Sequence, residues 1–291
     1  MTKLMQLLSR CRSLWLMAPL GLWGCQSESG TAPSEGGTPG ATPAPAASPA
    51  PAAKQELVVF AAASLRDAFG SLKTEFGKTH PTVDVTFNFA GTQDLRVQLE
   101  HGAAVDVFAS ADQENMNELE TAGRVSKPVV FARNEPVIVV AKERASAVSS
   151  LADLPKLDQL VIGVPDVPIG RYTAQILNNA NETLGADFSS KVEKKIVSRE
   201  LDVRQVLAKV TLGEADAGIV YRTDANSAKD KVSVVSIPAD VNVIAQYPIA
   251  VVAAAPHAAP ANEWLKFVLS PAGQELLGEA GFLAPAPAPA Q

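Results

Sequence analysis

Short apolar runs typical of β-strands alternate along most of the chain with segments whose apolar residues recur at helical spacing. The first such pair joins the run 57–61 to Leu65, Phe69, Leu72 and Phe76, which lie four, three and four residues apart. The same reading predicts further strands at 83–89, 105–109, 129–131, 137–141, 160–164, 217–221, 232–237 and 249–253. Helices are predicted at 94–101, 170–179, 203–212 and from Ser270-Pro271 onward. This alternation predicts an α/β fold with mainly parallel sheets and helices on both faces.

The first 24 residues have the pattern of a secretory signal. Lys3, Arg10 and Arg12 precede an apolar run, 14–22, that is too short to span a bilayer. The run ends in Leu22-Trp23-Gly24-Cys25, which resembles a bacterial lipobox, so we expect Cys25 to be lipidated and to become the mature N-terminus. The alternative is ordinary signal cleavage nearby, with Cys25 incidental. Cys11 lies in the removed segment, so the mature chain would hold one cysteine and no disulfide.

Both ends of the mature chain differ in composition from the middle. Residues 25–55 are dominated by Ser, Gly, Thr, Pro and Ala, and residues 284–291 form a second Pro/Ala stretch. Such segments bury too little apolar surface to offset the entropy of ordering. We therefore expect a flexible tether at 25–55 and a disordered tail at 284–291.

The charge of the chain limits how it could bind an anion. The sequence has 25 basic and 31 acidic residues; without residues 1–24 it has 22 basic and 31 acidic residues, a net charge near -9. This acidity argues against nucleic acid as a partner. An anion site in such a protein would have to depend on local dipoles and hydrogen-bond donors.

Four predicted junctions bring a strand into the start of a helix through small or hydroxyl residues. They are Ala63-Ser64, Gly91-Thr92, Pro168-Ile169-Gly170 and Asp202-Val203. The first N–H groups of a helix lack internal acceptors, so each junction is a potential anion cradle. Ser64 and Thr92 are also explained as simple helix caps, and Asp202 is expected to serve as a cap. Four junctions together with Tyr221, at the end of a buried strand, indicate a site at one sheet edge.

Several segments resemble the periplasmic molybdate-binding proteins of ABC transporters, which have the type II periplasmic binding protein fold. The resemblance runs from about residue 57 to residue 282, and its most specific segments are 59–65, 89–92, 106–112, 167–172, 217–221 and 247–250. It implies an oxyanion site made by Ser64 and Thr92 through hydroxyl and N–H, Ile169 and Val203 through N–H, and Tyr221 through its phenol. Serine is common at position 92 and alanine at position 169 in that family, so the pocket shape could differ here.

The resemblance also implies two lobes with the ligand in the cleft between them. Lobe I would comprise 56–135 and 248–283 and lobe II 136–247, with chain crossings near 134–137 and 245–249. The implied protein is a monomeric receptor without a cofactor, anchored in the periplasm or at the cell surface. Its partners would be an ABC permease with its ATPase. Closure around the anion would be the signal that the permease reads.

A pocket that contains only donors suits molybdate, which is fully deprotonated near neutral pH. Phosphate keeps a proton on part of its population and is best held by a site that includes an acceptor, which this set lacks unless Asp202 turns inward. Sulfate must be rejected by size, because its bonds to oxygen are shorter. Tungstate is nearly as large as molybdate, and the sequence does not separate the two.

Other functions remain open at this point. Another oxyanion such as sulfate, or a role as an oxyanion sensor for a signalling partner, would use the same fold. Ferric iron needs paired tyrosines and carboxylates, whereas Tyr172, Tyr221 and Tyr247 are not adjacent. A hydrolase is disfavoured because Ser64 lacks the glycines of a nucleophile elbow. The three histidines, at 80, 101 and 257, suggest no triad or metal cluster, so no catalysis is expected.

Overall fold

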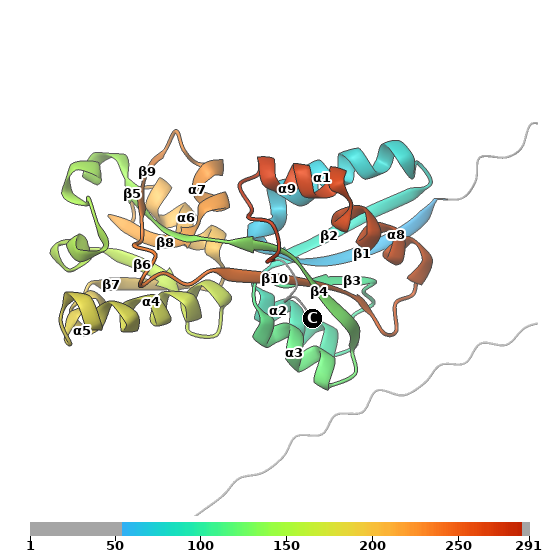
Figure 1. The fold of residues 1–291 in the computed structure, drawn as a ribbon, viewed down its shortest axis with the longest axis horizontal. Helices are drawn as coiled ribbons and strands as arrows, with labels where there is room; N and C mark the ends of the chain where they lie inside the picture. The colour runs from blue at the N-terminus through green and yellow to red at the C-terminus, as the bar shows by residue number, and fades with distance from the viewer. Residues whose placement is uncertain (1–53, 287–291) are drawn as a thin grey trace, which may run out of the picture. The chain divides into compact units, whose positions relative to one another are not determined.

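The computed structural model describes residues 54–286. The expected signal at 1–24, the lipidation at Cys25 and the tether up to residue 53 lie outside the described residues. The described chain forms two mixed five-stranded sheets flanked by helices, seen as the two halves of Figure 1. We call the half that contains the first sheet lobe I and the other half lobe II.

The sheet of lobe I has the strand order β2-β1-β3-β10-β4. Its strands are β1 (Gln55–Ala62), β2 (Val83–Ala90), β3 (Val107–Ala109), β4 (Val125–Asn134) and β10 (Ala245–Val252). Its helices are η1 (Ala63–Leu65), α1 (Arg66–Thr79), α2 (Thr92–Glu100), α3 (Gln113–Thr121), α8 (Ala258–Leu269) and α9 (Pro271–Glu279). Helices α1, α8 and α9 cover one face of the sheet, and α2 and α3 cover the other (Figure 1).

The sheet of lobe II has the strand order β7-β6-β8-β5-β9. Its strands are β5 (Pro136–Ala141), β6 (Leu160–Gly163), β7 (Ile196–Glu200), β8 (Ala217–Tyr221) and β9 (Val232–Ser236). Its helices are η2 (Lys142–Ala147), η3 (Leu151–Lys156), α4 (Pro168–Leu184), α5 (Phe188–Glu193), α6 (Val203–Thr211) and α7 (Arg222–Ser227). Helices α4 and α5 lie on one side of this sheet and α6 and α7 on the other (Figure 1).

Two chain crossings connect the lobes and explain why the sheets are mixed. Strand β4 of lobe I continues through Glu135 directly into β5 of lobe II, and β9 returns through 237–244 to β10. The strand that follows each crossing is antiparallel to its neighbours: β10 pairs antiparallel with β3 and β4, and β5 pairs antiparallel with β8 and β9. The remaining pairs are parallel, so each sheet is half parallel where the sequence predicted a mainly parallel one.

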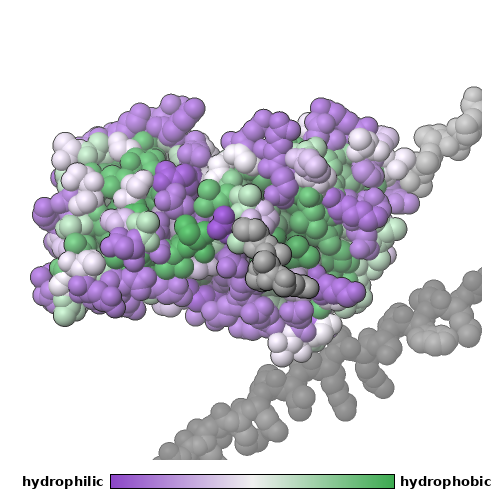
Figure 2. Space-filling model, viewed as in Figure 1, coloured by the Kyte–Doolittle hydropathy of each residue, from purple (hydrophilic) through white to green (hydrophobic). Residues whose placement is uncertain are grey.

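Apolar side chains fill both faces of the sheet of lobe I. In β1, Val59 and Ala61 belong to the main core, whereas Phe60 points to the opposite face, as the two-residue period of a strand requires. Helix α8 contributes Trp264, whose ring meets Phe69 and Phe76 edge-on at centroid distances of 5.7 and 5.2 Å. Figure 2 shows hydrophilic residues around the outer edges of both lobes in that view, with hydrophobic residues nearer the middle.

The sequence missed helices α3, α5, α7 and α8 and strand β7. Most of these are short or weakly periodic; α5 and α7 have six residues each, too few to establish a helical period. Strand β1 begins at Gln55, inside the expected tether, and β10 begins at Ala245, ahead of the expected lobe boundary. The carbonyl of Ala284, expected in the disordered tail, accepts a hydrogen bond from Arg133 at 2.7 Å. No helix within residues 54–286 is long and apolar enough to cross a membrane.

Candidate functional site

A small pocket lies where the two lobes face each other, and all five residues expected to bind the oxyanion line it. Its walls are formed by Ala62, Ala63, Ser64, Ala90, Gly91, Thr92 and Ala111 of lobe I and by Val167, Pro168, Ile169, Asp202, Val203 and Tyr221 of lobe II. Its volume is about 20 Å³, on the scale on which one water molecule needs roughly 10–15 Å³. A space of this size fits a small ion and excludes sugars and peptides.

Ser64 reaches the pocket from the turn that follows β1. The strand ends at Ala62 and continues into the short helix η1, so Ser64 stands at the carboxyl end of the sheet and is 2% exposed. Its Oγ lies 2.9 Å from the phenol oxygen of Tyr247, which belongs to the crossing strand β10. This serine is therefore held by a buried hydrogen bond before any ligand is considered.

Thr92 is the first residue of α2, directly after Gly91. Its Oγ1 accepts a hydrogen bond from the N–H of Ala111 at 3.2 Å. The hydroxyl proton of Thr92 is not used in that bond and is free to point at a ligand. Gly91 is required here because a Cβ atom at this position would lie 2.5 Å from the carbonyl oxygen of Leu201 in lobe II.

Lobe II presents the N-termini of two helices to the pocket. Helix α4 starts at Pro168, so Ile169 is its second residue, within the turn whose N–H groups have no acceptor in the helix. Helix α6 starts at Val203 after Asp202, whose side chain accepts hydrogen bonds from the N–H groups of Arg204 and Gln205. The Asp202 side chain thus satisfies the second and third N–H groups of α6 but not the N–H of Val203.

The same cap settles the role of Asp202. Although Asp202 lines the pocket, Oδ1 accepts from two backbone N–H groups and Oδ2 accepts from Nε2 of Gln205 at 2.8 Å. The cap expected from the sequence is confirmed. Its carboxylate is engaged by the helix, so the pocket keeps the donor character expected of an oxyanion site.

Tyr221 closes the pocket at the end of β8 and is 1% exposed. Its phenol oxygen is buried and has no hydrogen-bond partner among the described residues. Burial raises the pKa of Tyr221 well above 10, so the phenol keeps its proton and acts as a donor at neutral pH. A buried donor without an acceptor is costly, so this atom points to a ligand that supplies the acceptor.

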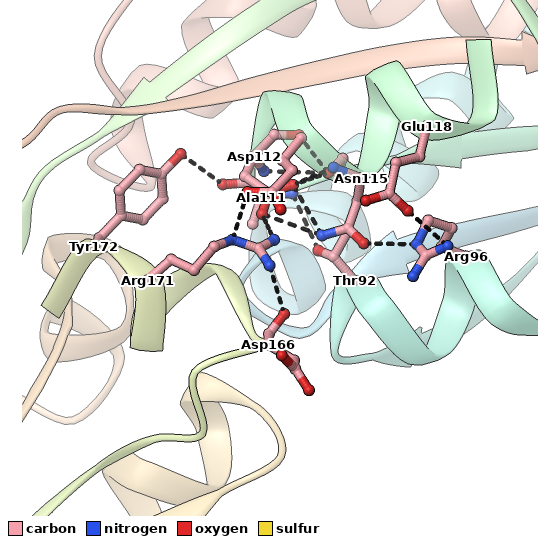
Figure 3. A network of polar contacts seen from close by, with 11 residues as sticks. Thr92, Arg96, Ala111, Asp112, Asn115, Glu118, Asp166, Arg171 and Tyr172 are labelled. Carbon is pink, nitrogen blue, oxygen red and sulfur yellow. Dashed lines mark hydrogen bonds and ion pairs between the residues drawn. The ribbon is translucent and has the colours of Figure 1, made fainter. Parts of the chain in front are cut away.

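Charged residues on one rim of the pocket join the lobes (Figure 3). Arg171 of α4 forms an ion pair with Asp112 and a second with Glu114 at 3.2 Å, both at the start of α3 in lobe I. The neighbouring Tyr172 donates to the carbonyl of Ala111 at 3.4 Å. Because the N–H of Ala111 binds Thr92, this rim connects lobe closure to one of the pocket hydroxyls.

A second arginine spans the lobes from α6. Nη2 of Arg204 lies 2.6 Å from Asp67 of α1 in lobe I. Its Nε lies 2.6 Å from Oδ1 of the fully buried Asp224, a charge contact without hydrogen-bond alignment. Burial raises the pKa of Asp224 to about 6, although Arg204 opposes that shift. Within residues 54–286 no group of three or more His, Cys, Asp or Glu side chains is arranged to hold a metal ion.

Sequence reasoning did not identify Tyr247, Arg171, Tyr172 or Asp112 as parts of this site. All four lie in segments that carried the family resemblance, 106–112, 167–172 and 247–250. The resemblance marked those segments without assigning these side chains a role. Their contacts join residues 59 to 183 positions apart, and such pairs are decided by the tertiary structure.

The chain matches the model of the family described as bacterial extracellular solute-binding proteins over residues 57–283. It is 39% identical over 234 residues to the molybdate-binding protein ModA of Mycobacterium tuberculosis, covering 79% of this chain and 85% of the relative. It is 35% identical to ModA of Escherichia coli, covering 68% and 77%. The solved periplasmic molybdate-binding protein of Azotobacter vinelandii has the same fold, with a TM-score of 0.70, 20% identity and coverage of 79% and 100%. The chain therefore belongs to the bacterial extracellular solute-binding proteins, in the group formed by its ModA relatives.

Proposed function

We propose that this protein captures molybdate in the interlobe pocket and delivers it to an ABC permease. The observation that carries the proposal is the buried Tyr221 phenol, a donor that has no acceptor among the described residues. It shares a small pocket with the hydroxyls of Ser64 and Thr92 and with the N-termini of α4 and α6. Relatives named molybdate-binding protein ModA over 79% of the chain support this choice of oxyanion.

The donor set favours an oxyanion that carries no proton. Oδ1 of Asp202 accepts two N–H groups of α6 and Oδ2 accepts from the side chain of Gln205, so this carboxylate has at most one acceptor site left for a protonated phosphate. Pocket size then separates molybdate from the smaller sulfate, because donors fixed on two lobes cannot all reach an ion with shorter bonds. Tungstate, almost as large as molybdate, is expected to bind as well.

The chain is proposed to work outside the cytoplasm as a monomeric lipoprotein. The family is one of extracellular solute-binding proteins. The Lys3, Arg10 and Arg12 signal pattern and the Leu22-Trp23-Gly24-Cys25 sequence support export and a thioether-linked lipid at Cys25. Binding and release by lobe closure require no cofactor and no chemical step on the anion.

The experiment is a calorimetric titration of the purified protein with molybdate, tungstate, sulfate and phosphate. We expect one-to-one binding of molybdate and tungstate, with sulfate and phosphate weaker by orders of magnitude. Silence for molybdate together with clear binding of sulfate or phosphate would overturn the choice of ligand while leaving an anion site in place. Mass spectrometry of the membrane-extracted N-terminal peptide tests lipidation at Cys25.

A further inference from the structure

A chain of buried side chains leads from one lobe crossing to the anion pocket. Asn134 ends β4 and Tyr247 lies on the partner strand β10, and these two strands pair with Ala245 opposite Asn134. Asn134 and Tyr247 are both 0% exposed, and the Tyr247 phenol is 2.9 Å from the Ser64 Oγ. Ser64 is thus connected to a strand that belongs to a lobe crossing.

The proton of the buried Tyr247 phenol needs an acceptor. Burial raises the pKa of Tyr247 well above 10, so that proton is present at neutral pH. The carboxylate of Asp224 influences Tyr247 electrostatically, but neither of its oxygens has a hydrogen-bond partner in residues 54–286. Within residues 54–286 the phenol has its hydrogen bond with the Ser64 Oγ. If Ser64 instead donated to Tyr247, the phenol proton would be buried without an acceptor, at a cost in free energy.

We propose that Tyr247 is a positioning residue that donates to the Ser64 Oγ and so commits the Ser64 proton to the bound oxyanion. This inference rests on the proposed function. The phenol then occupies one lone pair of the Ser64 Oγ, and the Ser64 proton, which has no other acceptor within residues 54–286, is left to point at the anion. This Tyr247–Ser64 contact, which we call the relay, therefore favours an oxyanion whose oxygen next to Ser64 carries no proton.

The test is a double-mutant cycle on Ser64 and Tyr247, with molybdate affinity as the readout. We expect Ser64→Ala to weaken binding about ten- to a hundredfold and Tyr247→Phe about five- to tenfold, because the phenyl ring still packs between Tyr221 and Phe282. The double variant should bind within about threefold of Ser64→Ala alone, since Tyr247 acts through the serine. If Tyr247 only supported the fold, the losses of affinity in the two single variants would multiply in the double variant.

Tyr172→Phe is the matched control. It removes the same atom from a neighbouring tyrosine of the site, but the Tyr172 phenol donates to Ala111 rather than to Ser64. Its effect should therefore multiply with that of Ser64→Ala. Thermal unfolding of each variant without ligand reports whether the fold is retained.

The outcomes separate the relay from the proposed function. If the unmodified protein fails to bind molybdate, the proposed function is wrong and the relay falls with it. If it binds molybdate but the Ser64 and Tyr247 effects multiply as those of the Tyr172 control do, the relay is wrong and the function stands. A Ser64→Ala variant with unchanged affinity would likewise overturn the relay. Effects of Ser64 and Tyr247 that do not multiply support it.

Discussion

The two walls of the pocket hold their polar groups in different ways. On lobe I, each hydroxyl already has a protein partner: Ser64 pairs with Tyr247, and Thr92 accepts from Ala111. On lobe II, the phenol of Tyr221 has none among the described residues. Just beyond it along the chain, the buried carboxylate of Asp224 also lacks a hydrogen bond within 54–286.

Because of this difference, the two walls have different roles when the anion binds. The wall of lobe I is organised within its own lobe and its crossing strand, so it can receive the anion without rearrangement. The wall of lobe II carries donors that gain an acceptor only when an anion binds. The ligand then favours closure because it supplies acceptors to the donors of lobe II. This difference in contacts between the two states is what shifts the population toward the closed state.

The largest expected effect comes from removing a lobe I hydroxyl. Ser64→Ala should weaken molybdate binding ten- to a hundredfold, because hydrogen bonds to a charged group contribute about 1.5–3 kcal/mol. It should also lower the unfolding free energy by about 1–3 kcal/mol, since Tyr247 loses its partner. Calorimetry and denaturant unfolding measure the two effects. Ser71→Ala, on the exposed face of α1, is the control that should leave affinity unchanged.

The corresponding change in lobe II should separate binding from stability. Tyr221→Phe should weaken molybdate binding by about tenfold while leaving the unfolding free energy of the ligand-free protein unchanged or raised, because the lost hydroxyl has no partner in the described chain. The same two measurements apply. A less stable variant with wild-type affinity would mean that the phenol is structural and that the two walls do not differ in this way.

A smaller effect is expected at the rim. Arg171→Gln removes the ion pairs to Asp112 and Glu114 and should weaken molybdate binding about two- to fivefold, mainly through faster release. Stopped-flow dissociation at low and high salt measures this, and the loss should shrink as salt rises. Arg199→Gln is a matched control because the Arg199 pair with Glu193 lies within lobe II. An equal loss in both variants would argue against a rim contact that holds the lobes closed.

The smallest effect on molybdate affinity is expected at Asp224, whose prediction concerns the pH dependence of stability. Burial raises its pKa from 3.8 to about 6, so between these values the folded protein binds more protons than the unfolded chain. The stability contributed by this carboxyl is fully present below pH 3.8 and is lost as pH rises through about 6. The unfolding free energy of Asp224→Asn minus that of wild type should therefore increase between pH 4 and 7. Denaturant unfolding in that range, with pH 7 and 8 expected to agree, tests the sign; a falling difference would contradict it.

Much of the lobe architecture was predictable from local pattern. The strand run at 57–61, its helix from Leu65 to Phe76 and the N-cap at Ser270 all correspond to elements of the structure, because periodicity and capping act over a few residues. The antiparallel course of β5 and β10 was not predictable in this way. It follows from the two crossings, each of which joins one sheet to the other.

By itself the sequence determined the αβ alternation and the helix start at Val203, and it placed the helix starts at Thr92 and Pro168 to within two residues. Through family resemblance it also indicated five of the residues that line the pocket. These features depend on neighbouring residues in the chain or on short sequence motifs. Only the tertiary structure decided that Tyr247 bonds Ser64, that Arg171 pairs with Asp112 and that the Tyr221 phenol has no acceptor within residues 54–286. A hydrogen bond depends on distance and direction in space, and residues 59 or 183 positions apart acquire both only when the chain has crossed between its lobes.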